Sequence, residues 1–376
     1  MTTLGPMLPS APTAPAVPPE FEGVRPTRRR WIALVVAMGL LLSVIVGAAI
    51  VQIPYVALRP GLVRPVTEQV LVDGAPSFAP EQSIAYTTVS VGSTTLLEAF
   101  VGWLDDDVDV LSERAVRGDK SEDENRRYNA QLMDTSKLTA IAVALDFLGQ
   151  EVDIRTTGTV VSEIAEGSPA AAALVLDDVI VAVDGEPLDV PGELGDLLQP
   201  GGPGVEHTLT VERPAGSTTR IEVEVTTIEA ADNTSRAIIG IAPEDRIADF
   251  DFPIDVTIDS GTVGGPSAGL AFTLAVLDVL TAGELTGGHK VAVTGTMALD
   301  GAVGRVGGGA QKAITVRNAG YDAFLVPSEE LEEVREAVGD DVEVIAVDSL
   351  AEALEALESL GGNAGSLLAA NVGPGG

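Results

Sequence analysis

The chain has 376 residues, of which 45% are hydrophobic, so it is long and apolar enough for two or three domains with buried cores. Its formal net charge is −34 at pH 7, and the whole negative excess follows Val51, because residues 1–30 are slightly basic and residues 31–51 are uncharged. This acidic surface repels phosphate backbones and argues against a nucleic-acid partner. The lack of cysteine excludes disulfides, thiolate zinc sites and a cysteine nucleophile, and with only two histidines no metal or other cofactor is expected.

The N-terminal residues predict a membrane anchor. Residues 1–30 are rich in proline, alanine and threonine, which predicts a disordered cytoplasmic tail. Residues 31–51 predict a transmembrane helix of about 32 Å, which matches the hydrocarbon core of a bilayer. Arg28–Arg30 outweigh the two arginines that follow the span, so we expect a single-pass protein of the cell membrane with extracytoplasmic domains and the lipid bilayer as a partner. The alternative is a cleaved signal peptide, because Val46–Ala48 is similar to a cleavage site.

Residues 52–150 are predicted to form an extracytoplasmic mixed segment. Residues 69–72 and 84–91 favour strands, residues 105–129 are polar enough for an exposed loop or helix, and residues 131–148 have helical character. No chemistry can be assigned to this segment from its residues.

Residues 151–230 have a compact, β-rich pattern, with a strand-like segment at 158–164, a turn at Gly167–Ala170 and the segment 178–187. The order of these pieces resembles a PDZ domain, although Asp177 stands where that family usually has glycine. The resemblance implies a peptide ligand that adds as a strand, against a short helix near residues 192–199. The peptide-binding residues that it implies are Thr159, Val160, Val161 and Ser162. The alternative is a PDZ fold that only packs against or shields the rest of the protein.

Residues 235–360 have an α/β pattern, in which predicted strands at 254–258 and 291–294 flank a helix that begins at Ser267. The predicted fold class is therefore α/β (α+β), with one N-terminal transmembrane helix, a β-rich domain and an α/β domain. Residues 361–376 are predicted to form a flexible tail.

Ser267 and Lys312 have the chemistry of a nucleophile and its base. The glycines and the proline of Gly264–Gly269 are expected to place Ser267 in the first turn of an apolar helix. Unpaired backbone N–H groups at such a helix start stabilise an oxyanion. Histidine, the usual base, occurs only at His207 and His289, so a lysine must accept the serine proton. Lys312 is a lone cation among small and apolar residues, and to act near neutral pH its pKa must fall by roughly three units, or about 4 kcal/mol.

Residues 259–327 resemble the proteolytic domain of Lon-type serine–lysine peptidases. The resemblance rests on Gly265–Gly269, Thr294–Thr296, Gly301–Gly308, Lys312 and Ala323–Pro327. It implies that Ser267 is the nucleophile and Lys312 the general base, that Thr294 orients the amine, and that the serine is supported by Gly265, Pro266 and Ala268. Many cytosolic members carry acidic residues where this chain has Gly264 and Thr296, so the mode of activation is left open.

The resemblance implies a membrane-anchored, ATP-independent serine endopeptidase. The sequence has no G-x-x-x-x-G-K-[ST] motif and lacks the ATPase module of cytosolic Lon. The expected partners are extracytoplasmic or membrane-associated polypeptide substrates, a peptide ligand of the PDZ domain, and further copies of the chain in a homo-oligomeric ring whose subunit number is left open.

Other interpretations stay open at this point. A glycine-rich loop before a helix can cradle phosphate, as in small-molecule kinases that share this fold, and Ser267 can be a helix cap with Lys312 a solvated cation. The whole chain can be a non-catalytic PDZ adaptor with a Lon-like assembly domain. We expect His289 to be exposed and Asp259 to form a turn.

Overall fold

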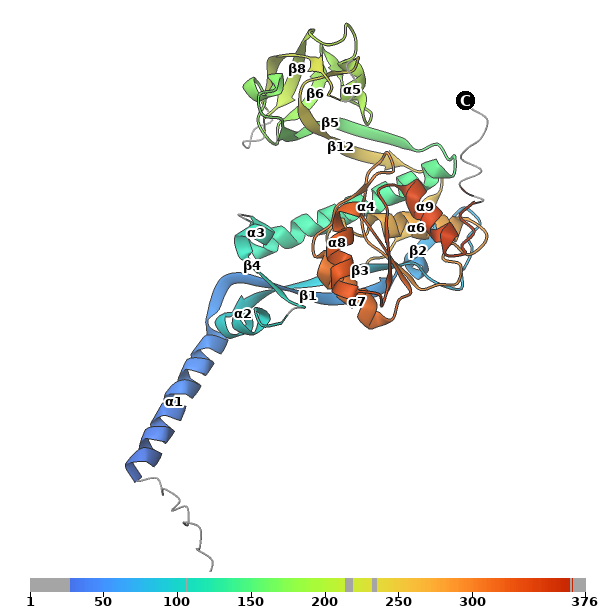
Figure 1. The fold of residues 1–376 in the computed structure, drawn as a ribbon. Helices are drawn as coiled ribbons and strands as arrows, with labels where there is room; N and C mark the ends of the chain where they lie inside the picture. Colours follow the sequence, from blue (N-terminus) through green and yellow to red (C-terminus); the bar gives the residue numbers. More distant parts are fainter. Residues whose placement is uncertain are drawn as a thin grey trace, which may run out of the picture.

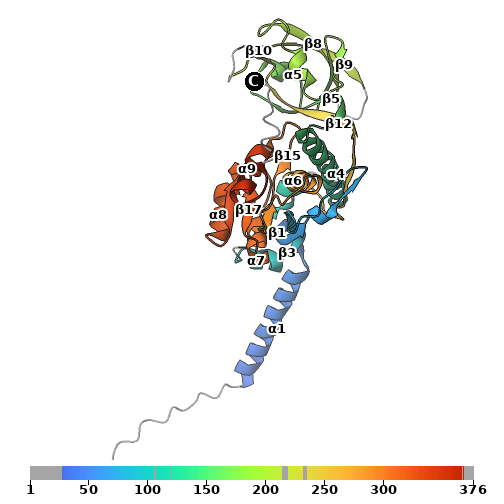
Figure 2. The same cartoon turned by 90° about the vertical axis from the view of Figure 1, so that its right-hand side faces the viewer.

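The computed structural model describes residues 28–105, 107–118, 120–213, 219–231, 235–365 and 367. These residues form a helical rod, an α/β body and a β-rich body, and the rod and the β-rich body lie at opposite ends of the α/β body (Figures 1 and 2). The predicted α/β fold class is confirmed. Most of the two predicted tails, residues 1–27 and 368–376, lies outside the described residues.

The rod is helix α1 (Arg28–Ile50), which contains the predicted span almost unchanged. None of its side chains is buried by the rest of the protein, although every residue after Arg30 except Ser43 is apolar. It is the one helix among the described residues that is long and apolar enough to cross a membrane.

The α/β body is built on a six-stranded sheet whose strands come from two distant parts of the chain. The strand order is β18-β17-β14-β3-β1-β4. Strand β14 pairs in parallel with β17 on one side and β3 on the other, whereas β1 runs antiparallel to β3 and β4. The strands are β1 (Gln52–Pro65), β3 (Ala85–Thr95), β4 (Asp109–Ser112), β14 (Val291–Val293), β17 (Ala323–Val326) and β18 (Glu343–Ala346). The segment 52–150 therefore completes the sheet to which residues 235–360 contribute.

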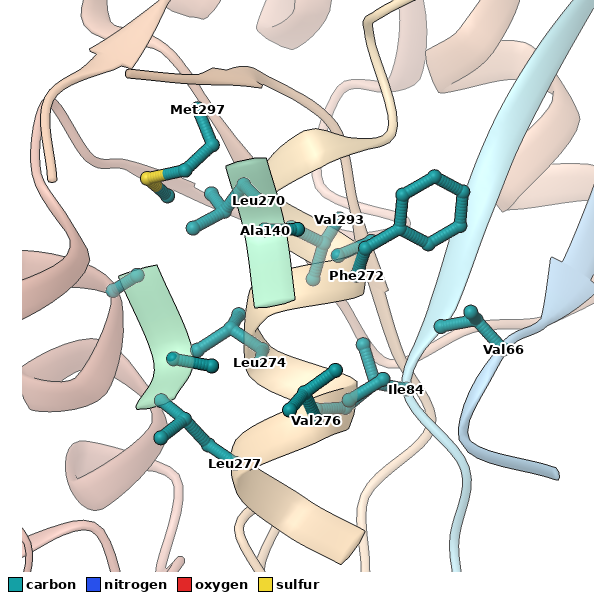
Figure 3. Packing of buried hydrophobic residues seen from close by; sticks show 14 of the residues in the cluster. Val66, Ile84, Ala140, Leu270, Phe272, Leu274, Val276, Leu277, Val293 and Met297 are labelled. Atoms are coloured by element: carbon teal, nitrogen blue, oxygen red, sulfur yellow. The ribbon is translucent and has the colours of Figure 1, made fainter. Parts of the chain in front are cut away.

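The core of this body centres on α6 (Gly269–Leu280), which is largely apolar and is buried on every side. Every residue of α6 except Leu280 is buried. A helix that is apolar all round needs partners on all sides, and α4 (Glu122–Phe147) and the sheet provide them. Figure 3 shows Leu270, Phe272 and Leu274 of α6 packed among side chains from these elements. The remaining helices are α2 (Leu96–Gly102), α3 (Glu113–Arg117), α7 (Gly309–Ala319), α8 (Leu331–Val338) and α9 (Leu350–Ser359).

The α/β body also contains two short antiparallel pairs. Strand β2 (Val70–Asp73) pairs with β13 (Asp255–Ile258), and β15 (Thr296–Met297) pairs with β16 (Val303–Gly304). The first pair again joins the segment 52–150 to the last third of the chain.

The β-rich body has its own sheet and its own apolar core. The main strand order is β12-β5-β6-β8-β9, and β7 pairs with β6. Its elements are β5 (Asp153–Ile164), β6 (Val179–Val183), β7 (Glu186–Pro187), α5 (Glu193–Leu197), β8 (Glu206–Glu212), β9 (Arg220–Thr226), β10 (Ile228–Glu229), β11 (Ala237–Ile238) and β12 (Ile241–Asp251). Although β12 falls within the range 235–360 assigned to the α/β domain from sequence, it pairs along β5 and belongs to this sheet.

The β-rich body is inserted into the α/β body. The chain leaves the α/β body after α4 and returns through β12 into β13. The two crossings, at which the chain passes from one body to the other, lie side by side, because Asp153 at the start of β5 is paired with Asp251 at the end of β12.

Because the two cores are separate, we expect a core substitution to loosen only its own body. Leu274→Ala should destabilise the α/β body by about 2–5 kcal/mol, the usual cost of truncating a buried leucine. Leu209→Ala, at an equally buried position of the β-rich body, should destabilise the β-rich body and leave the α/β body unchanged. Hydrogen exchange read by mass spectrometry measures amide opening in each body, and equal loosening of both bodies by either change would contradict two independent cores.

Candidate active site

Lys312 lies at the start of α7, with its side chain almost fully enclosed. Gly308 precedes the helix with a φ of +71°, and a Cβ there would lie 2.9 Å from Val89 and 3.1 Å from Leu58. Glycine therefore allows the start of α7 to approach β1 and β3 closely. Lys312 is 2% exposed, which excludes the interpretation that it is a solvated surface cation.

Thr294 connects the amine of Lys312 to the backbone of Ser267. The Nζ of Lys312 donates to the Oγ1 of Thr294 at 3.1 Å, and the Thr294 hydroxyl donates to the carbonyl oxygen of Ser267 at 3.1 Å. The same carbonyl accepts the N–H of Gly295 at 2.9 Å. Thr294 is fully buried directly after β14, and its own N–H donates to Leu325 of β17 at 3.0 Å. The structure thus brings together the three residues that the resemblance groups.

Ser267 lies just before α6 and not in its first turn, which corrects the sequence prediction. The helix begins at Gly269, and Ala268 occupies its N-cap position. Within the described residues, the Ser267 hydroxyl makes no direct hydrogen bond to the Lys312 amine. The backbone N–H groups of Ser267 and Ala268 also find no acceptor in this part of the chain, so two donors remain available beside the helix start.

Helix α4 holds the loop that carries Ser267. The carbonyl of Asn129 accepts the N–H of Gly265 at 2.8 Å, and the Oγ of Ser136 donates to the carbonyl of Pro266 at 3.2 Å. Gly265 has a φ of +96°, a conformation that favours glycine. Sequence reasoning missed Asn129 and Ser136 because no motif marks them. No residue type could have signalled Asn129, because it contributes its backbone carbonyl.

Burial lowers the pKa of Lys312 from 10.5 to about 8, because an enclosed ammonium loses its hydration. The carboxylate of Glu330 acts in the opposite direction and raises this pKa. Glu330 is itself buried, and the Nε of Arg305 donates to its Oε1 at 3.2 Å. A Cβ on Gly309 would come within 2.8 Å of the Glu330 Oε2, so this carboxylate lies against the first residue of α7. With both effects included, about half of the Lys312 side chains are neutral near pH 8.

The strand predicted to receive a peptide has no free edge. Thr159–Ser162 lie within β5, which pairs with β12 on one side and β6 on the other. The Thr159 hydroxyl donates to Asp245 at 3.2 Å, and the Ser162 hydroxyl donates to the carbonyl of Ala242 at 2.9 Å. A peptide therefore cannot add beside Thr159, Val160, Val161 and Ser162, because the chain's own β12 occupies that edge.

A hollow of about 650 Å³ lies instead between α5 and residues 235–243. Its walls include Leu194 and Leu198 from the helical side and Ile239 and Ile241 from the side of β12. Because β12 is the last strand of its sheet, its outer edge is open to a further strand.

His289 and Asp259 have partners away from Lys312. His289 is exposed, and its Nδ1 lies 3.7 Å from a carboxylate oxygen of Asp322. The Asp259 carboxylate accepts the N–H of Gly261 at 3.0 Å and forms the expected turn. The candidate site therefore consists of Ser267, Thr294 and Lys312 with the loops that hold them.

We expect Lys312→Met to stabilise the protein at neutral pH. A pKa lowered from 10.5 to about 8 means that the fold encloses an ammonium at a cost of about 3 kcal/mol below pH 8. Between pH 8 and 10.5 the unfolded chain binds the extra proton, so the wild type gains stability as pH rises and the difference from the variant shrinks.

Urea unfolding measured below and above this window tests the expectation, with the exposed Lys290→Met as the matched control. An identical pH dependence in the wild type and Lys312→Met would contradict it.

Comparison with known proteins matches both bodies to families. Residues 221–359 match the family described as Lon protease (S16) C-terminal proteolytic domain, and residues 160–213 match the family described as PDZ domain.

Curated relatives cover only part of the chain. The Lon protease of Clostridioides difficile is 37% identical over 107 residues, which are 27% of this chain and 13% of that protein. The Lon protease of Mycoplasma mobile is 33% identical over 117 residues, or 29% of this chain and 14% of that protein. The Lon protease of Campylobacter concisus is 24% identical over 172 residues, which are 45% of this chain and 20% of that protein. The chain thus spans a fifth or less of the length of these relatives.

Solved structures include the PDZ domain of the SdrC-like protein from Listeria monocytogenes, which is 19% identical to this chain. That likeness covers 23% of this chain and 87% of the solved domain, with a TM-score of 0.21. From the family matches, the chain joins a PDZ domain to a C-terminal proteolytic domain of the Lon protease (S16) family.

Proposed function

We propose that this chain is a membrane-anchored serine endopeptidase in which Ser267 is the nucleophile and Lys312 the general base. The observation that carries the proposal is the enclosed amine of Lys312, bonded through Thr294 to the residue that bears the hydroxyl. A lysine with a pKa of about 8 keeps a neutral fraction at physiological pH, and that fraction is able to accept the serine proton.

In the first step, the Oγ of Ser267 attacks the peptide carbonyl while the neutral amine of Lys312 takes the hydroxyl proton. The resulting ammonium then donates this proton to the leaving amine, and an acyl-enzyme remains. Water then attacks the acyl-enzyme while the neutral amine of Lys312 takes a proton from it. As the acyl C–O bond breaks, Lys312 returns this proton to the Oγ of Ser267, which releases the product and restores both residues. Apo geometries of catalytic pairs are often long, so substrate binding is expected to complete the contact between hydroxyl and amine.

The oxyanion of each tetrahedral intermediate needs donors that are already in place. The free backbone N–H groups of Ser267 and Ala268 supply them at the start of α6, where the helix dipole favours negative charge. Gly265 and Pro266 support this arrangement, because their backbone groups bond to α4 and hold the loop against the core.

Thr294 acts as the positioning residue for the amine. Its hydroxyl accepts a hydrogen bond from Lys312 and donates its own proton to Ser267, so the acceptor lone pair always faces the amine. This orientation holds in both protonation states of Lys312, because both the amine and the ammonium can donate.

Helix α1 anchors the enzyme in the proposed arrangement. Its unburied aliphatic side chains require an apolar solvent, and Arg28–Arg30 at its start favour the cytoplasmic side. The PDZ and proteolytic domains are then extracytoplasmic. The sequence contains no nucleotide-binding loop of the G-x-x-x-x-G-K-[ST] type, so the proposed cleavage is independent of ATP and acts on extended or unfolded polypeptides.

The proposed peptide ligand of the PDZ domain lies in the hollow between α5 and residues 235–243. There an extended segment is able to pair with the open edge of β12 and to place apolar side chains against Leu194 and Leu198.

We expect Ser267→Ala and Lys312→Met each to lower turnover of an unfolded, fluorescein-labelled polypeptide by on the order of a thousandfold or more, because nucleophile and base act as one unit. The full-length protein is assayed in detergent micelles. Lys290→Met is the matched control, since this lysine is exposed and should leave turnover unchanged.

A non-catalytic adaptor is distinguished in the same experiment. A fluorophosphonate probe should label the wild type and not Ser267→Ala. Binding of peptides without turnover or labelling would instead support the adaptor and end the case for proteolysis.

We also expect the rate constant kcat/KM to rise through neutral pH with a midpoint near 8. Glu330→Gln should move this rising limb of the pH profile to lower pH, because the Glu330 carboxylate raises the pKa of Lys312. Glu329→Gln is the control, since Glu329 is exposed and lies 3.8 Å from the same Arg305. A limb that stays in place in Glu330→Gln, or moves to higher pH, would show that Lys312 is not the titrating base.

A further inference from the structure

An apolar surface beside the end of α1 has no role in the proposed proteolysis. In space, the start of α2 lies next to the end of α1 (Figure 1). The N–H of Leu96, the first residue of α2, donates to the carbonyl of Val51 at 3.0 Å. Apart from the half-buried Leu97, the large apolar side chains of α2 and of the two residues after it are exposed, with Trp103 at 59% and Leu104 at 73%. We call the following five residues the α2 face: Leu96, Phe100, Val101, Trp103 and Leu104.

The α2 face points its large residues away from the protein. The buried residues of α2 are its small ones, Ala99 and Gly102. A Cβ on Gly102 would come within 2.8 Å of Val110 in β4, so this side of the helix is held close to the sheet. In a helix that packs on a protein core and faces water, the large apolar residues turn inward. This helix has the opposite distribution.

The helix is also held rigidly. Thr95 and Glu98 form a capping box, in which the Thr95 hydroxyl accepts the N–H of Glu98 at 3.3 Å and Glu98 accepts the N–H of Thr95 at 2.9 Å. At the other end, the N–H of Trp103 donates to the carbonyl of Ala99 at 2.9 Å and that of Leu104 donates to the carbonyl of Val101 at 3.0 Å, so hydrogen bonds hold both ends of the exposed apolar segment.

The aromatic residues of this region occupy the places that mark a membrane interface. The chain has two tryptophans, Trp31 near the start of α1 and Trp103 beside its end. The ring of Trp103 meets that of Tyr55 edge-on with centroids 6.5 Å apart, and both side chains are exposed. Tryptophan and tyrosine are enriched at both boundaries of a bilayer, where an apolar ring carries a polar group.

We propose that the α2 face lies in the headgroup region of the bilayer that α1 crosses, so that the α/β body is held on the membrane by two contacts. The inference rests on the proposed anchoring by α1. A lipid surface is the occupant because the α2 face continues directly from the membrane helix. A contiguous apolar face of this kind is unfavourable in water. With both contacts in place, the body is unable to swing freely about the end of α1.

The charges at the border of the α2 face indicate which lipids it contacts. Three acidic residues, Glu98, Asp105 and Asp107, are exposed beside it, against one nearby cation among the described residues, Arg59, so the border has a negative excess. Acidic side chains are repelled by anionic headgroups, so the contact depends on apolar burial and favours zwitterionic lipid.

Tryptophan fluorescence separates the two membrane contacts, because the chain holds only two tryptophans. Trp31→Phe leaves Trp103 to report on the α2 face, and Trp103→Phe leaves Trp31 to report on α1. Each full-length protein is reconstituted into phosphatidylcholine vesicles that carry bromine either close to the headgroup or near the chain end. We expect headgroup-proximal bromine to quench Trp103 as strongly as Trp31, and chain-end bromine to quench both less.

The outcomes distinguish the α2 contact from the anchor and from proteolysis. Quenching of Trp31 without quenching of Trp103 would overturn the α2 contact and leave anchoring by α1 intact. Absence of quenching at both positions would overturn both. Trp103 emission that is shielded from bromine and changes with protein concentration would show that a second copy covers the α2 face. Adding Ser267→Ala should leave all quenching unchanged, so a failure of proteolysis is read separately.

A charged variant tests the apolar nature of the contact. Phe100→Asp combined with Leu104→Asp, in the Trp31→Phe chain, should reduce the quenching of Trp103, and both positions are exposed, so folding is retained. Leu176→Asp, at an equally exposed position of the PDZ domain, is the matched control and should keep the quenching. Adding phosphatidylglycerol should weaken the quenching of Trp103, and stronger quenching with anionic lipid would contradict the inference.

Discussion

The enclosure of one amine is the constraint that organises the proteolytic domain. Water normally stabilises an ammonium, and Lys312 has exchanged it for the hydroxyl of Thr294 and the more distant carboxylate of Glu330. Thr294 is held by its position after β14, in the middle of the sheet, and Gly308 lets α7 approach the neighbouring strands. A larger residue at Gly308 would push the helix away and admit water beside the amine.

The segment 52–150 forms the walls of this site although it carries no motif of its own. Strands β1 and β3 supply Leu58 and Val89, which lie against the start of α7. Helix α4 bonds to the loop that carries Ser267 through Asn129 and Ser136. The proteolytic domain is therefore larger in space than the family match at residues 221–359, because half of its sheet comes from before the PDZ domain.

Features set by neighbours in the chain were predictable, and features set by distant pairing were not. The fold class followed from periodicity, and Ser267 and Lys312 stood out because glycine, proline and a lone cation mark their surroundings. The residues of β12 do not reveal that it pairs with β5, so the sequence alone assigns a peptide to an edge that β12 already occupies. Asn129 and Ser136 matter only because α4 packs on α6, which no local pattern encodes.

The adjacent crossings at Asp153 and Asp251 make the PDZ domain a module with a single point of attachment. Domain insertion is tolerated where the two ends of the inserted piece meet, because the host needs only a short turn to close the gap. Replacing or removing an insertion of this kind need not displace the elements around Lys312, because none of them lies between Asp153 and Asp251. It also explains how the contiguous α/β body is encoded in two separated stretches of sequence.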